Sequence, residues 1–258
     1  MKRMIGLTLA CTMLCSLAMP VSADDVLFTV DCSVKNSNSE SDVWATFKND
    51  GVLTISGTGK MDSYFLTDGA EESPDYPWTS DEYKNAVTSI VIEEGVTFVD
   101  VFSMLPELKH IHFANSIESI NPFDWALCLN LETAFIPAGI DTTETGNVFK
   151  FAADNFTVYG YKNTTAEEFA GRYEYNFHAM GDMNSDGSVD LSEATEILNR
   201  FARAGAGIDE PETEDGVPDT ADVNQDETVG IDDATIALTY YASAAAGEEF
   251  NWTELVFK

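Results

Sequence analysis

A stretch of twelve residues, from Asp182 to Glu193, constrains the fold of this chain more than any other. Oxygen-bearing side chains stand at its positions 1, 3, 5, 9 and 12, and Gly187 stands at position 6. Calcium takes about six to eight oxygen ligands, and this spacing wraps one short loop around one ion. The predicted ligands are Asp182, Asn184, Asp186 and Glu193, the main-chain carbonyl of Ser188, and Asp190 acting through a water molecule. The stretch therefore predicts a calcium-binding loop.

A second copy of this loop begins forty residues later. Its predicted ligands are Asp222, Asn224, Asp226, Thr228 and Asp233. The residues after each loop also correspond, which indicates a duplicated structural unit. Position 6 of the second loop is Glu227, and positive φ at a residue with a Cβ costs roughly 1–2 kcal/mol. We therefore expect two Ca²⁺ ions, the second bound more weakly, while an acidic loop that stays empty remains the alternative.

Neither loop is preceded by a sequence that favours a helix. Residues 175–180 alternate like a strand, and residues 209–218 hold two prolines, which a helix interior does not tolerate. Two loop–helix repeats without entering helices resemble the type I dockerin of bacterial cellulosomes, over residues 181–247. The resemblance implies a small all-α calcium-binding domain that docks onto a cohesin module of a scaffolding protein. It also implies that metal binding and folding are one event.

The resemblance implies a cohesin-binding surface on the two predicted helices. By position in the repeat it comprises Leu191, Ser192, Leu198, Asn199, Arg200 and Arg203, with Ile231, Asp232, Leu238, Thr239, Tyr240 and Ser243 as counterparts. Because several paired residues differ, we expect two docking orientations to be inequivalent. The alternative is that Leu198 and Leu238 fill the core between the helices. The apolar tail, residues 248–258, is expected to pack against these helices or the end of the preceding domain.

The chain begins with two basic residues, an apolar run and a small-residue site ending at Ala23, which predicts a secretory signal peptide over residues 1–23. Export places the protein outside the cell, free or attached to the cell surface through the scaffolding protein. Without the peptide, 11 basic residues face 45 acidic ones, a balance that excludes nucleic acid and anionic membranes as partners. No other stretch is apolar enough to predict membrane insertion. We expect Cys32 and Cys128 to be buried free thiols, although pairing is open.

Residues 24–180 predict a mainly β domain made of repeats. An Asp50-Gly51 turn joins two alternating runs into a hairpin over residues 43–57. A pattern of apolar residues over 102–113 then recurs over 125–136, a period of about twenty-two. Each unit offers one short strand whose apolar side needs a neighbour to cover it, so the units must stack into a solenoid. The pattern resembles the leucine-rich repeats of bacterial surface antigens, with residues 141–154 breaking the period.

Outward positions on the stacked strands are expected to share one exposed face. This expected ligand face comprises Val91, His110, His112, Thr133 and Phe135, beside Ser89. A protein or carbohydrate ligand would lie there, although a solvated sheet without any ligand is equally compatible. No third ligand stands near the two histidines, so a metal pair is not expected.

No catalytic motif is found in the sequence. It lacks the serine elbow, the zinc-peptidase histidine pair and the phosphate-binding glycine loop. Its abundant carboxylates single out no glycosidase pair. We therefore interpret the chain as a non-catalytic secreted cellulosome component. The alternatives are a hydrolase of plant polysaccharides with an unrecognised small catalytic domain, and a cell-surface adhesin.

Overall fold

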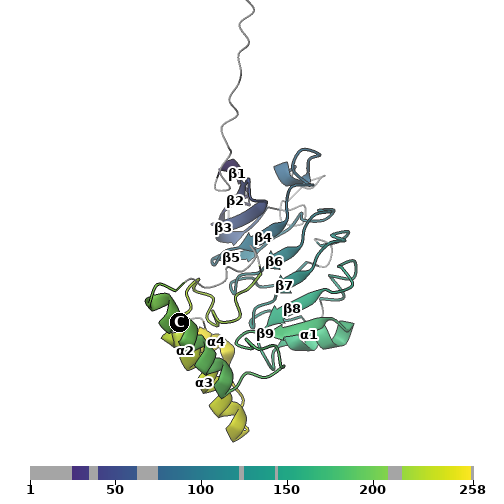
Figure 1. The fold of residues 1–258 in the computed structure, drawn as a ribbon. Helices are drawn as coiled ribbons and strands as arrows, with labels where there is room; N and C mark the ends of the chain where they lie inside the picture. The colour runs from purple at the N-terminus through teal and green to yellow at the C-terminus, as the bar shows by residue number, and fades with distance from the viewer. Residues whose placement is uncertain are drawn as a thin grey trace, which may run out of the picture.

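The computed structural model describes residues 25–34, 40–62, 75–121, 125–142, 145–208 and 217–256. In this part of the chain the fold is mainly β sheet with few helices (Figure 1). The strands form one stacked sheet, and two longer helices lie beyond the C-terminal end of that sheet. The predicted signal peptide and residues 209–216, which belong to the proline-containing stretch before the second loop, lie outside the described residues.

The sheet begins with three antiparallel strands, β1 (Val26–Asp31), β2 (Asp42–Lys48) and β3 (Val52–Lys60). The predicted hairpin is confirmed, because β2 and β3 flank the Asp50-Gly51 turn. Gly51 has φ +93°, and a Cβ there would stand 2.5 Å from the Thr88 hydroxyl oxygen. A short 3₁₀ helix, Pro77–Thr79, follows, and residues 81–86 form a turn.

Five short parallel strands continue the sheet, as the repeat predicts. They are β4 (Ser89–Ile92), β6 (His110–His112), β7 (Thr133–Phe135), β8 (Thr157–Gly160) and β9 (Asn176–Ala179). Their register pairs Ile90 with Ile111, then Ala134, Val158 and Phe177. Strand β5 (Val96–Phe98) pairs with β3, and helix α1 (Thr165–Tyr173) contacts β8 and β9 near the end of the stack.

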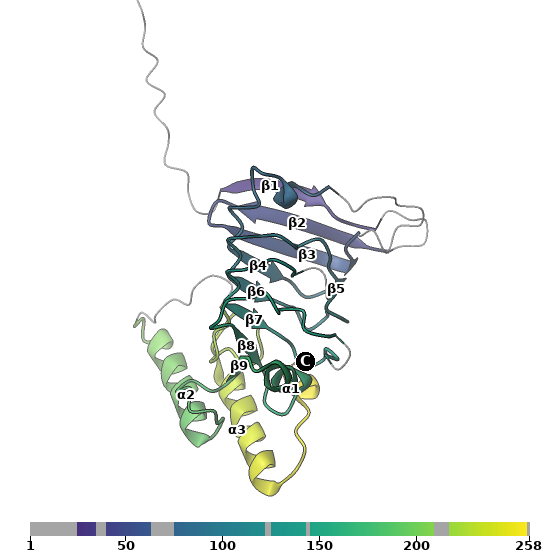
Figure 2. The same cartoon turned by 90° about the vertical axis from the view of Figure 1, so that its right-hand side faces the viewer.

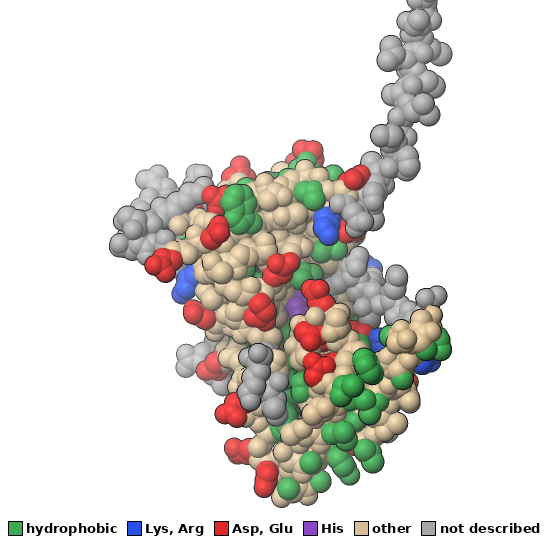
Figure 3. All heavy atoms as spheres, turned by 90° about the vertical axis from the view of Figure 1, so that its left-hand side faces the viewer, with side chains coloured by type: hydrophobic (Ala, Val, Ile, Leu, Met, Phe, Trp, Pro, Cys, Tyr) green, Lys and Arg blue, Asp and Glu red, His purple; other side chains and the backbone are tan. Residues whose placement is uncertain are grey.

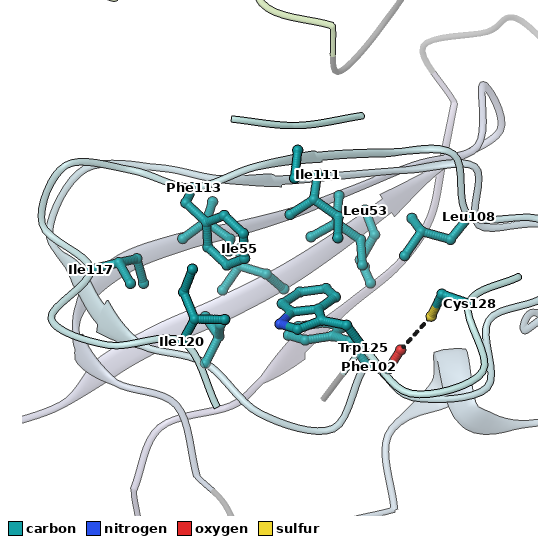
Figure 4. Close-up of a cluster of buried hydrophobic side chains, with 14 of the residues drawn as sticks. Leu53, Ile55, Phe102, Leu108, Ile111, Phe113, Ile117, Ile120, Trp125 and Cys128 are labelled. Atoms are coloured by element: carbon teal, nitrogen blue, oxygen red, sulfur yellow. Dashed lines mark hydrogen bonds between the residues drawn. The ribbon is translucent and has the colours of Figure 1, made fainter. Parts of the chain in front are cut away.

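The core of the stack is a ladder of aromatic rings at equivalent positions of successive repeats. Trp78, Phe102 and Trp125 lie face to face, with ring centres 5.6 and 5.4 Å apart. Figure 4 shows Trp125 and Phe102 among the inward aliphatic side chains. The Cys128 thiol donates to the Phe102 carbonyl at 3.4 Å. Cys32 and Cys128 are both buried, and they form no disulfide with each other, as predicted.

Residues 181–247 form what we call the loop–helix unit. Helices α2 (Leu191–Gly205) and α3 (Ile231–Ala246) lie side by side (Figures 1 and 2), and the short α4 (Trp252–Val256) follows. Strand β9 leads into the first loop, and the described residues before the second loop, 217–221, contain no helix. Within the described ranges, no helix is long and apolar enough to cross a membrane.

Candidate metal centre

The first loop folds around the carboxylate of Asp182. Its two oxygens accept hydrogen bonds from the main-chain N–H groups of Asp186 at 3.2 Å and Gly187 at 2.9 Å. Asn184 Oδ1 accepts from the same Asp186 N–H at 2.8 Å. Gly187 has φ +86°, the left-handed conformation that glycine adopts without strain. The loop thus turns the side chains at positions 1 and 3 toward its own main chain, and the carboxylate at position 5 accepts from the Ser188 N–H at 2.9 Å.

The end of the first loop is also the start of α2. Glu193 Oε2 accepts from the Asp190 N–H at 3.0 Å, while Asp190 Oδ1 accepts from the Ser192 N–H at 2.7 Å, forming a capping box. The other oxygen of Glu193 accepts from the Asn184 amide at 2.6 Å. Position 12 therefore links the loop directly to the first turn of the helix.

The second loop repeats this geometry. The Asp222 carboxylate accepts from the N–H groups of Asp226 at 3.1 Å and Glu227 at 2.9 Å. Asp233 closes the loop by accepting from the Gly230 and Val223 N–H groups, both at 2.7 Å. Glu227, at position 6 of this loop, has φ +69°, the left-handed conformation that we predicted from its alignment with Gly187.

Each loop buries its first and last carboxylates. Asp182 and Glu193 are 3% and 1% exposed, and Asp222 and Asp233 are 8% and 0% exposed. Within the described residues none of the four forms an ion pair with a Lys or Arg. Burial, followed by repulsion from Asp233, raises the pKa of Asp222 to about 7. Burial also raises the pKa of Asp233. Buried carboxylates without a counter-charge are costly unless a cation joins them.

The side chains fit calcium better than a softer metal. No three His, Cys, Asp or Glu side chains of the described residues come together as a preformed metal cluster. An EF-hand-type loop instead completes its oxygen set with amide and main-chain carbonyl groups. The first loop offers Asn184 and Ser188 for this purpose, and the second offers Asn224 and Thr228. These residues would hold Ca²⁺, which remains a prediction.

The helices behind the loops expose equivalent apolar side chains. Leu191 and Leu198 of α2 are 57% and 40% exposed, and Ile231 and Leu238 of α3 are 58% and 36% exposed. Leu198 and Leu238 therefore do not fill the core between the helices. The other predicted surface residues that are exposed are Ser192, Asn199, Arg203, Asp232 and Thr239. The predicted surface omitted Phe201 and Tyr241, which are each 41% exposed. Their equivalent positions in the two repeats were the sequence signal that could have identified them.

Three residues of the predicted cohesin-binding surface are less available. Tyr240 is 7% exposed and stacks on Trp252 at 4.8 Å, so its placement on that surface was wrong. The tail of the chain covers it. Arg200 is half-buried and forms a two-point ion pair with Asp219, both contacts at 2.7 Å. Ser243 is half-buried.

The prediction of one exposed ligand face on the sheet was wrong in part. His110 and Ser89 are each 2% exposed, and Phe135 is 0% exposed. Phe135 shares a buried cluster with Met180 and Val223, because the loop–helix unit packs onto the C-terminal part of the outer face. Val91, His112 and Thr133 stay half-buried. Alternation indicated which side chains lie on the outer face, but not that the loop–helix unit covers Phe135.

Hydrogen bonds fasten the loop–helix unit to the sheet. The Tyr161 hydroxyl donates to the Val223 carbonyl of the second loop at 2.8 Å. His178 Nε2 donates to the Asp182 carbonyl of the first loop at 2.8 Å. The Trp252 indole N–H donates to the Lys162 carbonyl at 2.8 Å. The tail therefore packs against both the helices and the sheet, as predicted.

No family model and no curated protein sequence matches this chain. Among solved structures, the chain is similar to a leucine-rich repeat protein from Eubacterium ventriosum. The match has 13% sequence identity and a TM-score of 0.26, and it covers 53% of this chain and 45% of that one. The chain thus spans less than half the length of that protein, and so low a TM-score supports no structural argument.

Proposed function

We propose that this protein is a secreted, non-catalytic component of a cellulosome. In this proposal residues 181–247 are a calcium-dependent dockerin that binds a cohesin module of a scaffolding protein. The observation that carries the proposal is the duplication. In both loops the carboxylate at position 1 accepts from the N–H groups at positions 5 and 6, and each loop is followed by a helix that exposes apolar side chains at equivalent positions.

Calcium would act by fixing the start of each helix. Position 12 of each loop is the third residue of the helix, and its carboxylate also bonds the residue that caps the helix. A cation held by positions 1 and 12 joins the loop to the helix end, and it removes the cost of two buried carboxylates. Leu191 and Ile231, the first residues of the two helices, would then be held in fixed directions.

The two halves of this surface are not equivalent. In α2, Arg200 is held by Asp219, whereas its counterpart Tyr240 in α3 lies under Trp252. Arg203 is exposed, whereas its counterpart Ser243 is uncharged and half-buried. A cohesin that binds the α2 side would therefore contact the arginines Arg200 and Arg203, and the α3 side has no arginine at the equivalent positions. This difference supports one preferred docking orientation.

In this proposal the stacked sheet is a leucine-rich repeat domain, and this domain binds the protein's ligand. The parallel register of β4 to β9 and the aromatic ladder support a repeat architecture. Its ligand would be a protein or a glycan.

Calorimetry of the full chain against a panel of cohesins, with calcium or with chelator, tests the docking proposal. We expect binding only with calcium, and abolished binding when Asp182 and Asp186 are both replaced by alanine. Leu198→Ala should weaken binding by about tenfold or more, as the loss of a central apolar contact does. Leu129→Ala is the matched control, since Leu129 is 57% exposed in the turn before β7, outside the loop–helix unit.

Two outcomes would refute the proposal in favour of its alternatives. Release of reducing sugar from plant polysaccharides by the full chain would indicate a hydrolase. Absence of binding to every cohesin of the source organism, together with adhesion to a surface, would indicate an adhesin whose calcium loops only stiffen the chain.

A further inference from the structure

A cleft of about 710 Å³ lies between the stacked sheet and the second calcium loop. One wall is the outer side of β4 and β6 and the residues after them, and the other is formed by residues 217–229. Cavities of this size hold small ligands or one or two side chains of a peptide. The part of the predicted ligand face that remains accessible, Val91 and His112, lines this cleft.

The cleft is strongly acidic. Five carboxylate residues line it, namely Glu93, Glu94, Asp219, Asp222 and Glu227, and among the residues that the structure describes no Lys or Arg lines it. Figure 3 shows acidic side chains around a histidine at the junction of the sheet and the loop–helix unit. Such a cavity concentrates cations and repels anions.

Two of these carboxylates are free to meet a ligand. Glu94 accepts from the main-chain N–H of Asn115 at 2.8 Å, Asp219 is paired with Arg200, and Asp222 turns into its own loop. Glu93 and Glu227 are exposed, and neither side chain forms a hydrogen bond or an ion pair within the described residues. They come from opposite walls, one from the sheet and one from the second loop.

The floor of the cleft offers apolar surface and an unused polar group. His112 stacks on Phe135 at 4.7 Å, and in the described structure its ring forms no hydrogen bond. Burial lowers the pKa of His112 to about 4, so at neutral pH the ring adds no positive charge. Its unprotonated nitrogen can then accept a hydrogen bond from a donor in the cleft. Val91 and Val229 provide apolar contact beside it.

We propose that this cleft binds a lysine or arginine side chain of a peptide segment of a partner protein. The apolar stem of the side chain would lie against Val91 and Val229, and its cationic group would lie between Glu93 and Glu227. A long basic side chain suits both features, because it combines an apolar stem with a charged end. The inference rests on the proposed function in one respect: it names the class of ligand that the leucine-rich repeat domain binds. It does not require cohesin binding.

Fluorescence anisotropy of the calcium-loaded full chain tests the inference. The probe is a labelled peptide, acetyl-Gly-Leu-Lys-Leu-Gly-amide, compared with versions that carry arginine, glutamine or glutamate in place of lysine. We expect the lysine and arginine peptides to bind, the other two not to bind, and binding to weaken with added salt. The double variant Glu93→Gln with Glu227→Gln should weaken binding at least about threefold, as expected from losing two partly solvated charge pairs.

A matched control uses carboxylates outside the cleft. Glu107→Gln with Glu168→Gln removes the same charge from two exposed positions and should leave peptide binding unchanged. An equal loss of peptide affinity in both double variants would show that only the overall charge matters, and it would overturn the inference. Equal binding of the glutamine peptide, or binding of a neutral oligosaccharide in place of the basic peptides, would also overturn it.

Cohesin binding separates this inference from the docking proposal. The cleft variant should bind its cohesin as the parent does, because neither glutamate lies on α2 or α3. Failure of peptide binding with intact cohesin binding would refute the cleft alone. Peptide binding without any cohesin binding would refute the docking proposal alone.

Discussion

Replacing Trp252 with alanine tests whether the tail joins the two parts of the molecule. Its side chain is 2% exposed, and its ring centre lies 4.7 Å from that of Tyr161, the residue after β8, and 4.8 Å from that of Tyr240 in α3. Its indole N–H donates to the Lys162 carbonyl at 2.8 Å. One side chain therefore contacts the end of the sheet and the second helix of the loop–helix unit.

The expected loss in the free energy of unfolding is about 3 kcal/mol. Deleting a buried tryptophan side chain usually costs about 3–5 kcal/mol. We expect the low end because α4, which carries Trp252, is only five residues long and can move to fill the space. Trp252→Phe is the control, since it keeps an aromatic ring but loses the indole donor. Trp252→Phe should lower the free energy of unfolding by about 1 kcal/mol for the lost hydrogen bond, and by a smaller amount for the lost ring contacts.

Urea unfolding of the calcium-loaded chain, followed by circular dichroism in the helix and sheet regions, measures both values. We expect one shared transition in the parent and an earlier loss of helix signal in Trp252→Ala. A loss below about 1 kcal/mol, the size of the hydrogen bond alone, would refute the role of the ring stack. Coincident helix and sheet transitions in the variant would refute its role in joining the two parts.

Three further predictions follow from single groups. Glu227→Gly should raise the free energy of unfolding by up to about 1 kcal/mol by relieving positive φ, and Gly187→Ala should lower it by a similar amount, both measured by urea unfolding. The raised pKa of Asp222 contributes stability that is present below about pH 4 and lost as pH rises through about 7. The chelated protein should therefore unfold at lower urea at pH 8 than at pH 5, by on the order of 1 kcal/mol per pH unit across that window, and calcium should remove the difference. Burial raises the pKa of Cys128 to about 11, so a thiol reagent should label this residue only after unfolding, and rapid labelling of the native chain would contradict its burial.

The features that sequence reasoning predicted well depend on residues close together in the chain. The Asp50-Gly51 turn fixes a hairpin because only the turn and its flanking strands decide it. The stacked strands follow from a repeat in which each unit must cover the next, so Ile90 and Ile111 align in register. The loops follow from a spacing that positions Asp182 against its own main chain.

The errors concern which parts of the chain cover others. Phe135 was assigned to an exposed face because alternation places it outward, but alternation says nothing about the loop–helix unit that packs over it. His110 was assigned to the same face and is also buried. Tyr240 was assigned to a docking surface by its position in the repeat, but the tail, which the repeat does not include, covers it. The repeat fixes the position of a side chain on its helix, whereas its neighbours come from distant sequence.

The contacts between the sheet and the loops connect the two proposals. The sheet holds the second loop through Tyr161 and the first through His178, each by a hydrogen bond to a loop carbonyl. These contacts support the loops independently of metal, so the proposed calcium would contribute less to folding here than in an isolated loop–helix unit. The second loop is also a wall of the acidic cleft. Calcium that fixes this loop should therefore strengthen binding of the basic peptide, and peptide should reciprocally strengthen calcium binding at the second loop. A peptide affinity unchanged by chelator would show that the sheet alone holds the cleft in shape.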